Sequence, residues 1–131
     1  MAKAPKKPLS SAQLEIMNLV WDRGELSVAE VWEALGSSRS LTRNTVQTTM
    51  VRLEEKGWLK HRSLGQSFLY SATHPREDTL NGLVARLVDT AFRGSAEGLV
   101  MALVEGRGLS AEERRRIVAL INAAEQKRRR S

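Results

Sequence analysis

The stretch from Thr42 to Arg52 is rich in polar side chains that can form hydrogen bonds with the edges of nucleic-acid bases. Asn and Gln form paired hydrogen bonds with adenine, Arg does so with guanine, and Thr can touch the thymine methyl group. Thr and Asn are poor helix formers, so an ordinary surface helix would favour Glu, Lys, Ala and Gln instead. The composition therefore predicts a base-reading surface. Its predicted members are Thr42, Arg43, Asn44, Thr45, Gln47, Thr48 and Arg52.

The same stretch has the spacing of an α-helix with one apolar face. At about 100° per residue, Val46, Met50 and Leu53 fall together and are predicted to pack inward. Thr42 is predicted to cap this helix and Gly57 to end it. The base-reading side chains would then lie on the opposite face, and the free N–H groups of the first turn can bind a phosphate. A solvated helix with several threonines is the alternative.

Basic residues gather in and after this helix. The chain carries 21 Lys and Arg against 15 Asp and Glu, a formal net charge of +6. Six basic but only two acidic residues lie between Arg39 and Arg62. Such an excess favours a polyanionic partner, although a basic surface can also serve solubility alone. Lys60, Arg62 and Gln66 are predicted to contact phosphate or the minor groove.

Two further helices are predicted before the base-reading helix. Ser10 and Ser27 each open a capping-box pattern, with Gln or Glu three residues later. The first helix is predicted to end at Gly24 and the second at Gly36, followed by a loop over residues 37–41. The apolar residues predicted to face inward from the second helix are Val28, Val31, Trp32 and Leu35.

A β-hairpin is predicted directly after the third helix. Residues 58–62 and 67–71 are short runs rich in aromatic residues, separated by residues 63–66 with a glycine among them. Three helices followed by a hairpin have the layout of a winged helix-turn-helix, although a fold by itself does not give a function. The tryptophans predicted to belong to the core are Trp21, Trp32 and Trp58.

After Pro75 the sequence returns to helical patterns, which are interrupted at Gly94, Gly106 and Gly108. About fifty residues are too few to bury a good core alone, so these helices are predicted to pair with a second copy of the chain. The alternative is a monomer in which they fold back onto residues 9–72. The predicted dimerisation residues are Leu80, Leu83, Val84, Leu87, Val88, Phe92, Leu99, Leu103, Ile117, Leu120 and Ile121.

The sequence thus predicts a mainly α-helical chain with a small β-hairpin, organised in three parts. Residues 1–8, with three lysines and two prolines, are predicted to form a flexible basic arm. Residues 9–74 are predicted to form a winged helix-turn-helix DNA-binding domain. Residues 75–131 are predicted to form a helical dimerisation domain.

The sequence gives little support to other classes of function. The chain has no cysteine, hence no disulfide and no thiolate metal site, and no apolar run approaches the ~20 residues of a membrane span. His61 and His74 are the only histidines and no carboxylates cluster at metal-ligand spacing, so neither an enzyme such as a nuclease nor a metal or cofactor is expected. A cytoplasmic location is the simplest expectation. The remaining alternative is a winged-helix protein-interaction module, which would need more apolar surface on the third helix than Val51 supplies.

Four stretches carry a family resemblance. They are LSSAQLEIMNLVW in the first helix, TRNTVQTTMVRLEEKGWL in the third, GQSFLYS in the hairpin and GLVMALVEGRGLSAEE near the end. Over roughly residues 9–125 the chain resembles the penicillinase repressor (BlaI/MecI/CopY) family of winged-helix transcriptional repressors. The third-helix stretch is the most specific, and its matching residues are Thr42, Thr45, Val46, Thr48, Arg52, Leu53, Lys56 and Gly57.

The resemblance implies a cytoplasmic homodimeric repressor that binds double-stranded operator DNA with a palindromic sequence and has no direct membrane association. In the penicillinase branch, a membrane sensor protease pathway triggers cleavage of the repressor between an Asn and a Phe. The matching positions here are Ala102 and Leu103, a departure that argues against the same cleavage chemistry. The copper-responsive branch binds metal through C-terminal cysteines, which this chain lacks.

Overall fold

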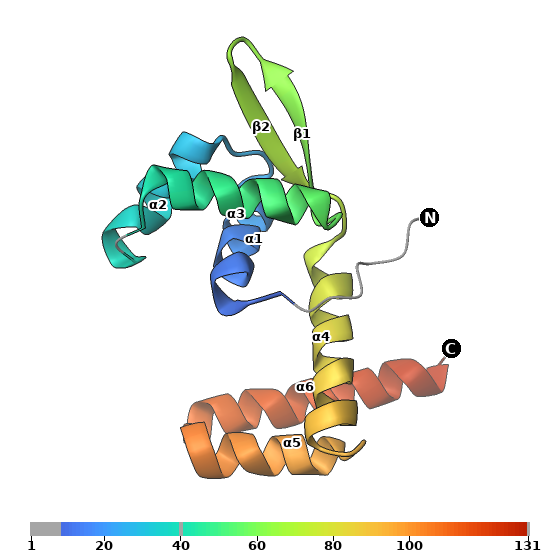
Figure 1. Cartoon of the computed structure of the whole chain (residues 1–131). Helices are drawn as coiled ribbons and strands as arrows, with labels where there is room; N and C mark the ends of the chain where they lie inside the picture. Colours follow the sequence, from blue (N-terminus) through green and yellow to red (C-terminus); the bar gives the residue numbers. More distant parts are fainter. Residues whose placement is uncertain (1–8, 40, 131) are drawn as a thin grey trace. The chain divides into compact units, whose positions relative to one another are not determined.

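The computed structural model describes residues 9–39 and 41–130, which form two compact units that divide between Val84 and Ala85 (Figure 1). The arm predicted over residues 1–8 lies outside the described residues. The domain boundary after residue 74 stays a prediction.

The first unit consists of three helices and a hairpin. Its elements are α1 (Ser11–Arg23), α2 (Val28–Arg39), α3 (Arg43–Glu55), β1 (Leu59–Leu64) and β2 (Ser67–Ala72). The two strands are antiparallel, with Leu59 opposite Ala72 and Leu64 opposite Ser67. Leu26, between α1 and α2, adds an isolated antiparallel bridge to Tyr70. This is the layout of a winged helix-turn-helix, and the predicted fold class is confirmed.

The core of this unit lies where the three helices meet the base of the hairpin. Val46, Met50 and Leu53 are fully buried, which confirms the predicted inward face of α3. The residues that complete the buried cluster are Leu9, Ile16, Met17, Val20, Leu26, Val31, Trp58, Leu59 and Tyr70. Because α3 is anchored along its whole length, its outer face has a fixed position beside the hairpin.

Side-chain caps start α1 and α2 where the sequence predicts them. The Gln13 backbone N–H donates to Ser10 Oγ at 3.2 Å, and the Ser10 N–H donates to Gln13 Oε1 at 2.9 Å. Ser27 and Glu30 form the same reciprocal pair at 3.2 and 3.0 Å. Each box satisfies two backbone donors that the first turn leaves unpaired. Gly24, with a φ of +89°, ends α1 as predicted.

Helix α2 continues past Gly36, so the prediction that this glycine ends the helix is wrong. The helix runs to Arg39, and the predicted loop is therefore wrong for residues 37–39, while residue 40 lies outside the described residues. Gly36 instead lies against the ring of Trp32: a Cβ at Gly36 would be 3.2 Å from the indole Nε1. A close approach within the helix thus explains a glycine that the sequence pattern presents as a stop.

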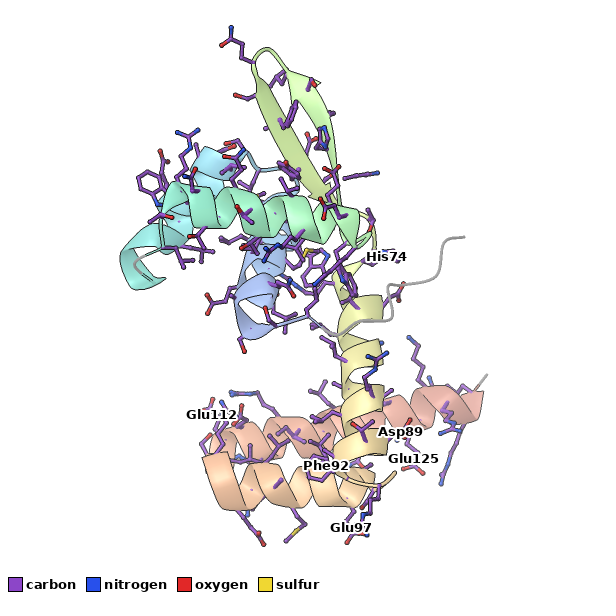
Figure 2. All side chains as sticks on the ribbon, viewed as in Figure 1. His74, Asp89, Phe92, Glu97, Glu112 and Glu125 are labelled. Carbon is purple, nitrogen blue, oxygen red and sulfur yellow. The ribbon has the colours of Figure 1, made fainter. Side chains whose placement is uncertain are left out.

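Trp32 itself is 38% exposed, so its assignment to the core is wrong. Its Nε1–H donates to the Leu41 carbonyl oxygen at 2.9 Å, which links α2 to the segment that enters α3. Trp58 is buried as predicted. Trp21 packs half-buried against the core and donates from Nε1 to the His74 carbonyl oxygen at 2.9 Å (Figure 2 labels His74).

The hairpin turn is shorter than the four-residue connection predicted from the sequence. The strands extend to Leu64 and begin again at Ser67, so Gly65 and Gln66 alone connect them. Gly65 has a φ of +62°. Two-residue turns with positive φ match the natural twist of paired strands, which explains why both strands continue up to the turn.

The second unit begins within α4 (Arg76–Ala91) and continues through α5 (Ala96–Ala102), the π-helical turn η1 (Leu103–Arg107) and α6 (Ala111–Arg130). Ser95 caps α5 by accepting from the Gly98 N–H at 2.9 Å. Gly98 lies close to Phe92, which is labelled in Figure 2, since a Cβ at Gly98 would be 3.3 Å from the Phe92 ring. These contacts order the short α5 next to the end of α4.

Of the two glycines predicted to interrupt the helical pattern here, Gly108 follows the last helical residue as predicted, but Gly106 does not interrupt the helix. It lies inside the π-helical turn, and Gly108, with a φ of +81°, follows the end of that turn. Across the described residues, no helix is both long and apolar enough to cross a membrane, and no three His, Asp or Glu side chains gather as a metal site requires.

Candidate nucleic-acid interface

Helix α3 starts with a cap made by two threonines. The Thr45 backbone N–H donates to Thr42 Oγ1 at 3.1 Å, and the two hydroxyl oxygens are 2.9 Å apart. Both side chains are exposed. The cap fixes the first turn of α3, where unpaired N–H groups and the helix dipole favour an anion such as phosphate. The predicted capping role of Thr42 is confirmed.

The outer face of α3 presents the predicted base-reading side chains together. Arg43, Asn44, Gln47, Thr48 and Arg52 are all exposed. A shallow hollow on this face is lined by Asn44, Gln47, Thr48, Val51, Arg52 and Glu55. These side chains therefore lie side by side on a surface that the core does not use.

Thr49 differs from the threonines around it. Its hydroxyl donates to the Thr45 carbonyl oxygen at 2.8 Å, one turn earlier in α3. A Ser or Thr hydroxyl that bonds back to its own helix is turned away from an external partner. This geometry agrees with the sequence prediction, which does not include Thr49 among the base-reading residues.

The end of α3 sets the start of the hairpin. The Gly57 N–H donates to the Glu54 carbonyl oxygen and the Trp58 N–H to that of Leu53, both at 2.9 Å. Gly57 has a φ of +90°, and the two bonds form a Schellman motif. The predicted role of Gly57 is confirmed. The chain thus leaves α3 in one defined direction and enters β1 two residues later.

A second hollow, of about 270 Å³, lies between the start of α3 and the hairpin. It brings Gln66 of the turn together with Arg43 and Gln47 of α3. The residues that complete its lining, none of which was predicted as a site residue, are Ser27, Val28, Ala29, Ser67, Phe68 and Tyr70. Nothing local marks them in the sequence, because they come from the start of α2 and from β2 and meet only in the folded unit.

Lys60 and Arg62 do not line either hollow. Side chains alternate along a strand, so these two share one face of β1, opposite to that of His61. Arg62 makes a bidentate ion pair with Glu25: Nε lies 2.7 Å from Oε2 and Nη2 lies 2.9 Å from Oε1. These hydrogen bonds hold the pKa of the Glu25 carboxyl below its usual value and raise the pKa of Arg62 further.

On the other face of β1, His61 links the hairpin to α3. Its Nδ1 lies 2.6 Å from Oε2 of Glu54. Its ring lies 4.4 Å from that of Phe68 and 5.5 Å from that of Tyr70, centroid to centroid. His61 therefore has a structural role in holding the hairpin against α3.

Comparison with known proteins places this geometry in a family. The penicillinase repressor family model matches residues 9–123. The penicillinase repressor of Bacillus licheniformis is 28% identical over 113 residues, which cover 86% of this chain and 87% of that protein. The transcriptional regulator BlaI of Mycobacterium tuberculosis (strain CDC 1551 / Oshkosh) is 30% identical over 126 residues, which cover 94% of this chain and 90% of that protein.

A solved structure supports the same relationship. The solution structure of Bacillus licheniformis BlaI, in its monomeric form in complex with the blaP half-operator, is 30% identical. It superposes with a TM-score of 0.50 and covers 59% of this chain and 93% of that one. The family match spans all four sequence stretches that carry the resemblance. The chain belongs to the penicillinase repressor family.

Proposed function

We propose that this chain is a sequence-specific DNA-binding transcriptional repressor that acts as a homodimer on a palindromic operator and is released by an inducing signal. The observation that carries the proposal is the outer face of α3. It presents Asn44, Gln47 and Thr48 to solvent, while the opposite face of the same helix is fully buried. Membership in a repressor family and similarity to a BlaI structure bound to a half-operator support it.

In the proposed complex α3 lies in the major groove and its N-terminal turns contact the base edges. Recognition helices of this fold read bases from their first turns, and the capped N-terminus of α3 offers free N–H groups to a phosphate. The hollow between α3 and the hairpin then receives one stretch of the DNA backbone. Gln66 of the hairpin turn and Arg43 of α3, which both line that hollow, would contact it.

Homodimerisation is proposed from the apolar surface of the second unit. No side chain within residues 85–130 is fully buried. Leu120 is 69% exposed and Ile121 58%, which is costly for such large side chains in a monomer. A second copy of the chain would cover this surface, and its twofold symmetry would match a palindrome whose half-sites lie about 34 Å apart.

The inducing signal is proposed to act on the second unit. The bond that matches the family's cleavage position joins Ala102, the last residue of α5, to Leu103, the first residue of the π-helical turn. A membrane sensor protease pathway is one source of such a signal. Ala-Leu in place of Asn-Phe argues against cleavage with the same sequence specificity.

The proposed function is tested by fluorescence anisotropy with two labelled duplexes at one moderate salt concentration. One duplex carries the DNA upstream of the gene for this chain, and the other has the same length and a shuffled sequence. Specific repressors bind their operators about 10³-fold or more tightly than random DNA. Equal affinity for the two duplexes would rule out the proposal. DNase footprinting on the upstream duplex would then locate the operator.

A further inference from the structure

Arg62 of the hairpin is already paired with a carboxylate in the DNA-free protein. Its guanidinium makes two roughly parallel hydrogen bonds to Glu25, at 2.7 and 2.9 Å. Arginine binds a phosphate with the same two-pronged geometry. Glu25 therefore presents Arg62 with the same pattern of acceptors as a phosphate group of the DNA backbone.

The position of Glu25 is fixed by the fold. Gly24 ends α1 immediately before it. Leu26, immediately after it, is buried and exchanges two backbone hydrogen bonds with Tyr70 of β2, at 3.0 and 2.8 Å. Because the backbone on both sides is held, the Glu25 side chain reaches Arg62 from a defined point beside the hairpin.

The pair is accessible, and Lys60 adds a second positive charge near Glu25. The side chain of Arg62 is 57% exposed and that of Glu25 is 38% exposed. The hydrogen bonds from Arg62 lower the pKa of Glu25, and the charge of Lys60 lowers it too, so Glu25 is ionised at neutral pH. Because solvent reaches and screens both partners, another anion can displace the carboxylate from Arg62.

We propose that Glu25 competes with DNA phosphate for Arg62, and thereby lowers the affinity of this chain for all DNA. This inference rests on the proposed function, because it assigns to Arg62 a phosphate contact in the complex. On binding, Arg62 exchanges one acceptor for another, and the net gain from its phosphate contact is smaller than that of an unpaired arginine. In this proposal Glu25 does not contact the DNA itself and affects DNA binding only through Arg62.

The test compares the wild-type chain with four variants: Glu25→Gln, Arg62→Ala, the double variant that combines these two, and Glu33→Gln. Fluorescence anisotropy measures the affinity of each protein for the shuffled and upstream duplexes. Glu25→Gln is expected to tighten binding to both duplexes by about two- to fivefold, the range for one exposed ion pair. In the Arg62→Ala background the same substitution is expected to give no gain. Glu33→Gln is the matched control for charge, since Glu33 is exposed on α2 and its neutralisation should leave affinity unchanged.

Three results would overturn the inference. Weaker or unaltered binding by Glu25→Gln would show that the pair only braces the hairpin, or that Arg62 does not reach phosphate. A gain that persists without Arg62, or that Glu33→Gln reproduces, would show a general effect of charge. Glu25→Asp, which keeps the charge but shortens the reach, is expected to give a gain as well and replaces Glu25→Gln if that variant unfolds in a thermal melt.

The failure of this inference can be told apart from the failure of the proposed function. A wild-type chain that does not prefer the upstream duplex would refute the specific repressor. The effect of Glu25 would still be measured on the shuffled duplex, because the proposed competition concerns phosphates and not bases.

Discussion

The carboxylate of Glu54 lies 2.6 Å from Nδ1 of His61 and so links the last turn of α3 to strand β1. Both side chains are about one-third exposed, at 29% and 33%. The contact ties α3 to the hairpin through residues outside the predicted DNA-binding set. The relative orientation of these two elements is therefore set within the protein before any DNA is bound.

Glu54→Ala is expected to lower the free energy of unfolding by about 1 kcal/mol, the usual contribution of one such hydrogen bond. Glu55→Ala is the matched control, because Glu55 is its exposed neighbour on the same helix and carries the same charge. Urea denaturation of the three proteins measures the difference. An equal loss in both variants would mean that the contact with His61 adds nothing beyond helix propensity.

Gln47→Ala is expected to reduce discrimination between operator and random DNA by about 1–3 kcal/mol, because an amide that pairs with one base is lost. Asn44→Ala should act in the same direction.

Arg62→Ala should instead weaken binding to both duplexes. It should also flatten the dependence of affinity on salt by about 0.9 in the logarithmic slope, which corresponds to one phosphate contact. Titrations at several salt concentrations measure both effects. If all three substitutions changed operator and random binding equally, the base-reading assignment would be refuted.

Ile121→Asp is expected to convert the proposed dimer into a monomer, because a charge would be placed in an interface made of apolar side chains. Affinity for the full operator should fall by more than tenfold, while affinity for a half-site should remain. Ala119→Glu is the control, since Ala119 lies on roughly the opposite side of α6 at about 100° per residue. Light scattering after gel filtration gives the mass of each variant. A monomeric wild-type chain at micromolar concentration would contradict the proposed assembly.

The capping box of α2 predicts a pH effect of defined sign. Hydrogen bonds from the Ser27 backbone N–H and then from its hydroxyl hold the pKa of Glu30 below its ordinary value of 4.5. The folded chain thus favours the ionised carboxylate. This contribution to stability is present above pH 4.5 and is lost as the pH falls through the lowered pKa.

Ser27→Ala is expected to raise the pKa of Glu30 toward 4.5 and to reduce the loss of stability below that pH. An NMR titration of the Glu30 side chain measures the shift. Ser63→Ala, at an exposed position on β1, should leave the Glu30 titration unchanged. A Glu30 pKa that does not respond to Ser27→Ala would assign the shift to other causes.

Local patterns were sufficient to predict the ends and the inner face of α3. Thr42 and Gly57 mark its ends by their own chemistry, and the spacing of Val46, Met50 and Leu53 identifies its inner face. Such features depend on residues within one or two turns of each other, so the sequence contains all the information they need. The DNA-binding roles assigned to the outer face stay predictions.

Other features were not predictable in this way, because they depend on distant residues or on local geometry that no residue type signals. The ion pair between Glu25 and Arg62 joins residues 37 positions apart, and it forms only because the hairpin returns past the segment after α1. Gly36 looked like a helix stop, but it accommodates the ring of Trp32. The π-helical turn at Leu103–Arg107 places one more residue in a turn than an α-helix does, and no residue type signals that change.

Under the proposed function, the two faces of α3 would allow this kind of protein to acquire a new DNA target without rebuilding its core. Val46, Met50 and Leu53 hold the helix in place, while Asn44 and Gln47 face solvent. Exchanges at exposed positions leave the buried volume unchanged and have little effect on folding. If Asn44 and Gln47 read bases as proposed, descendants of one ancestral chain could diverge in the genes they control while the scaffold stays the same.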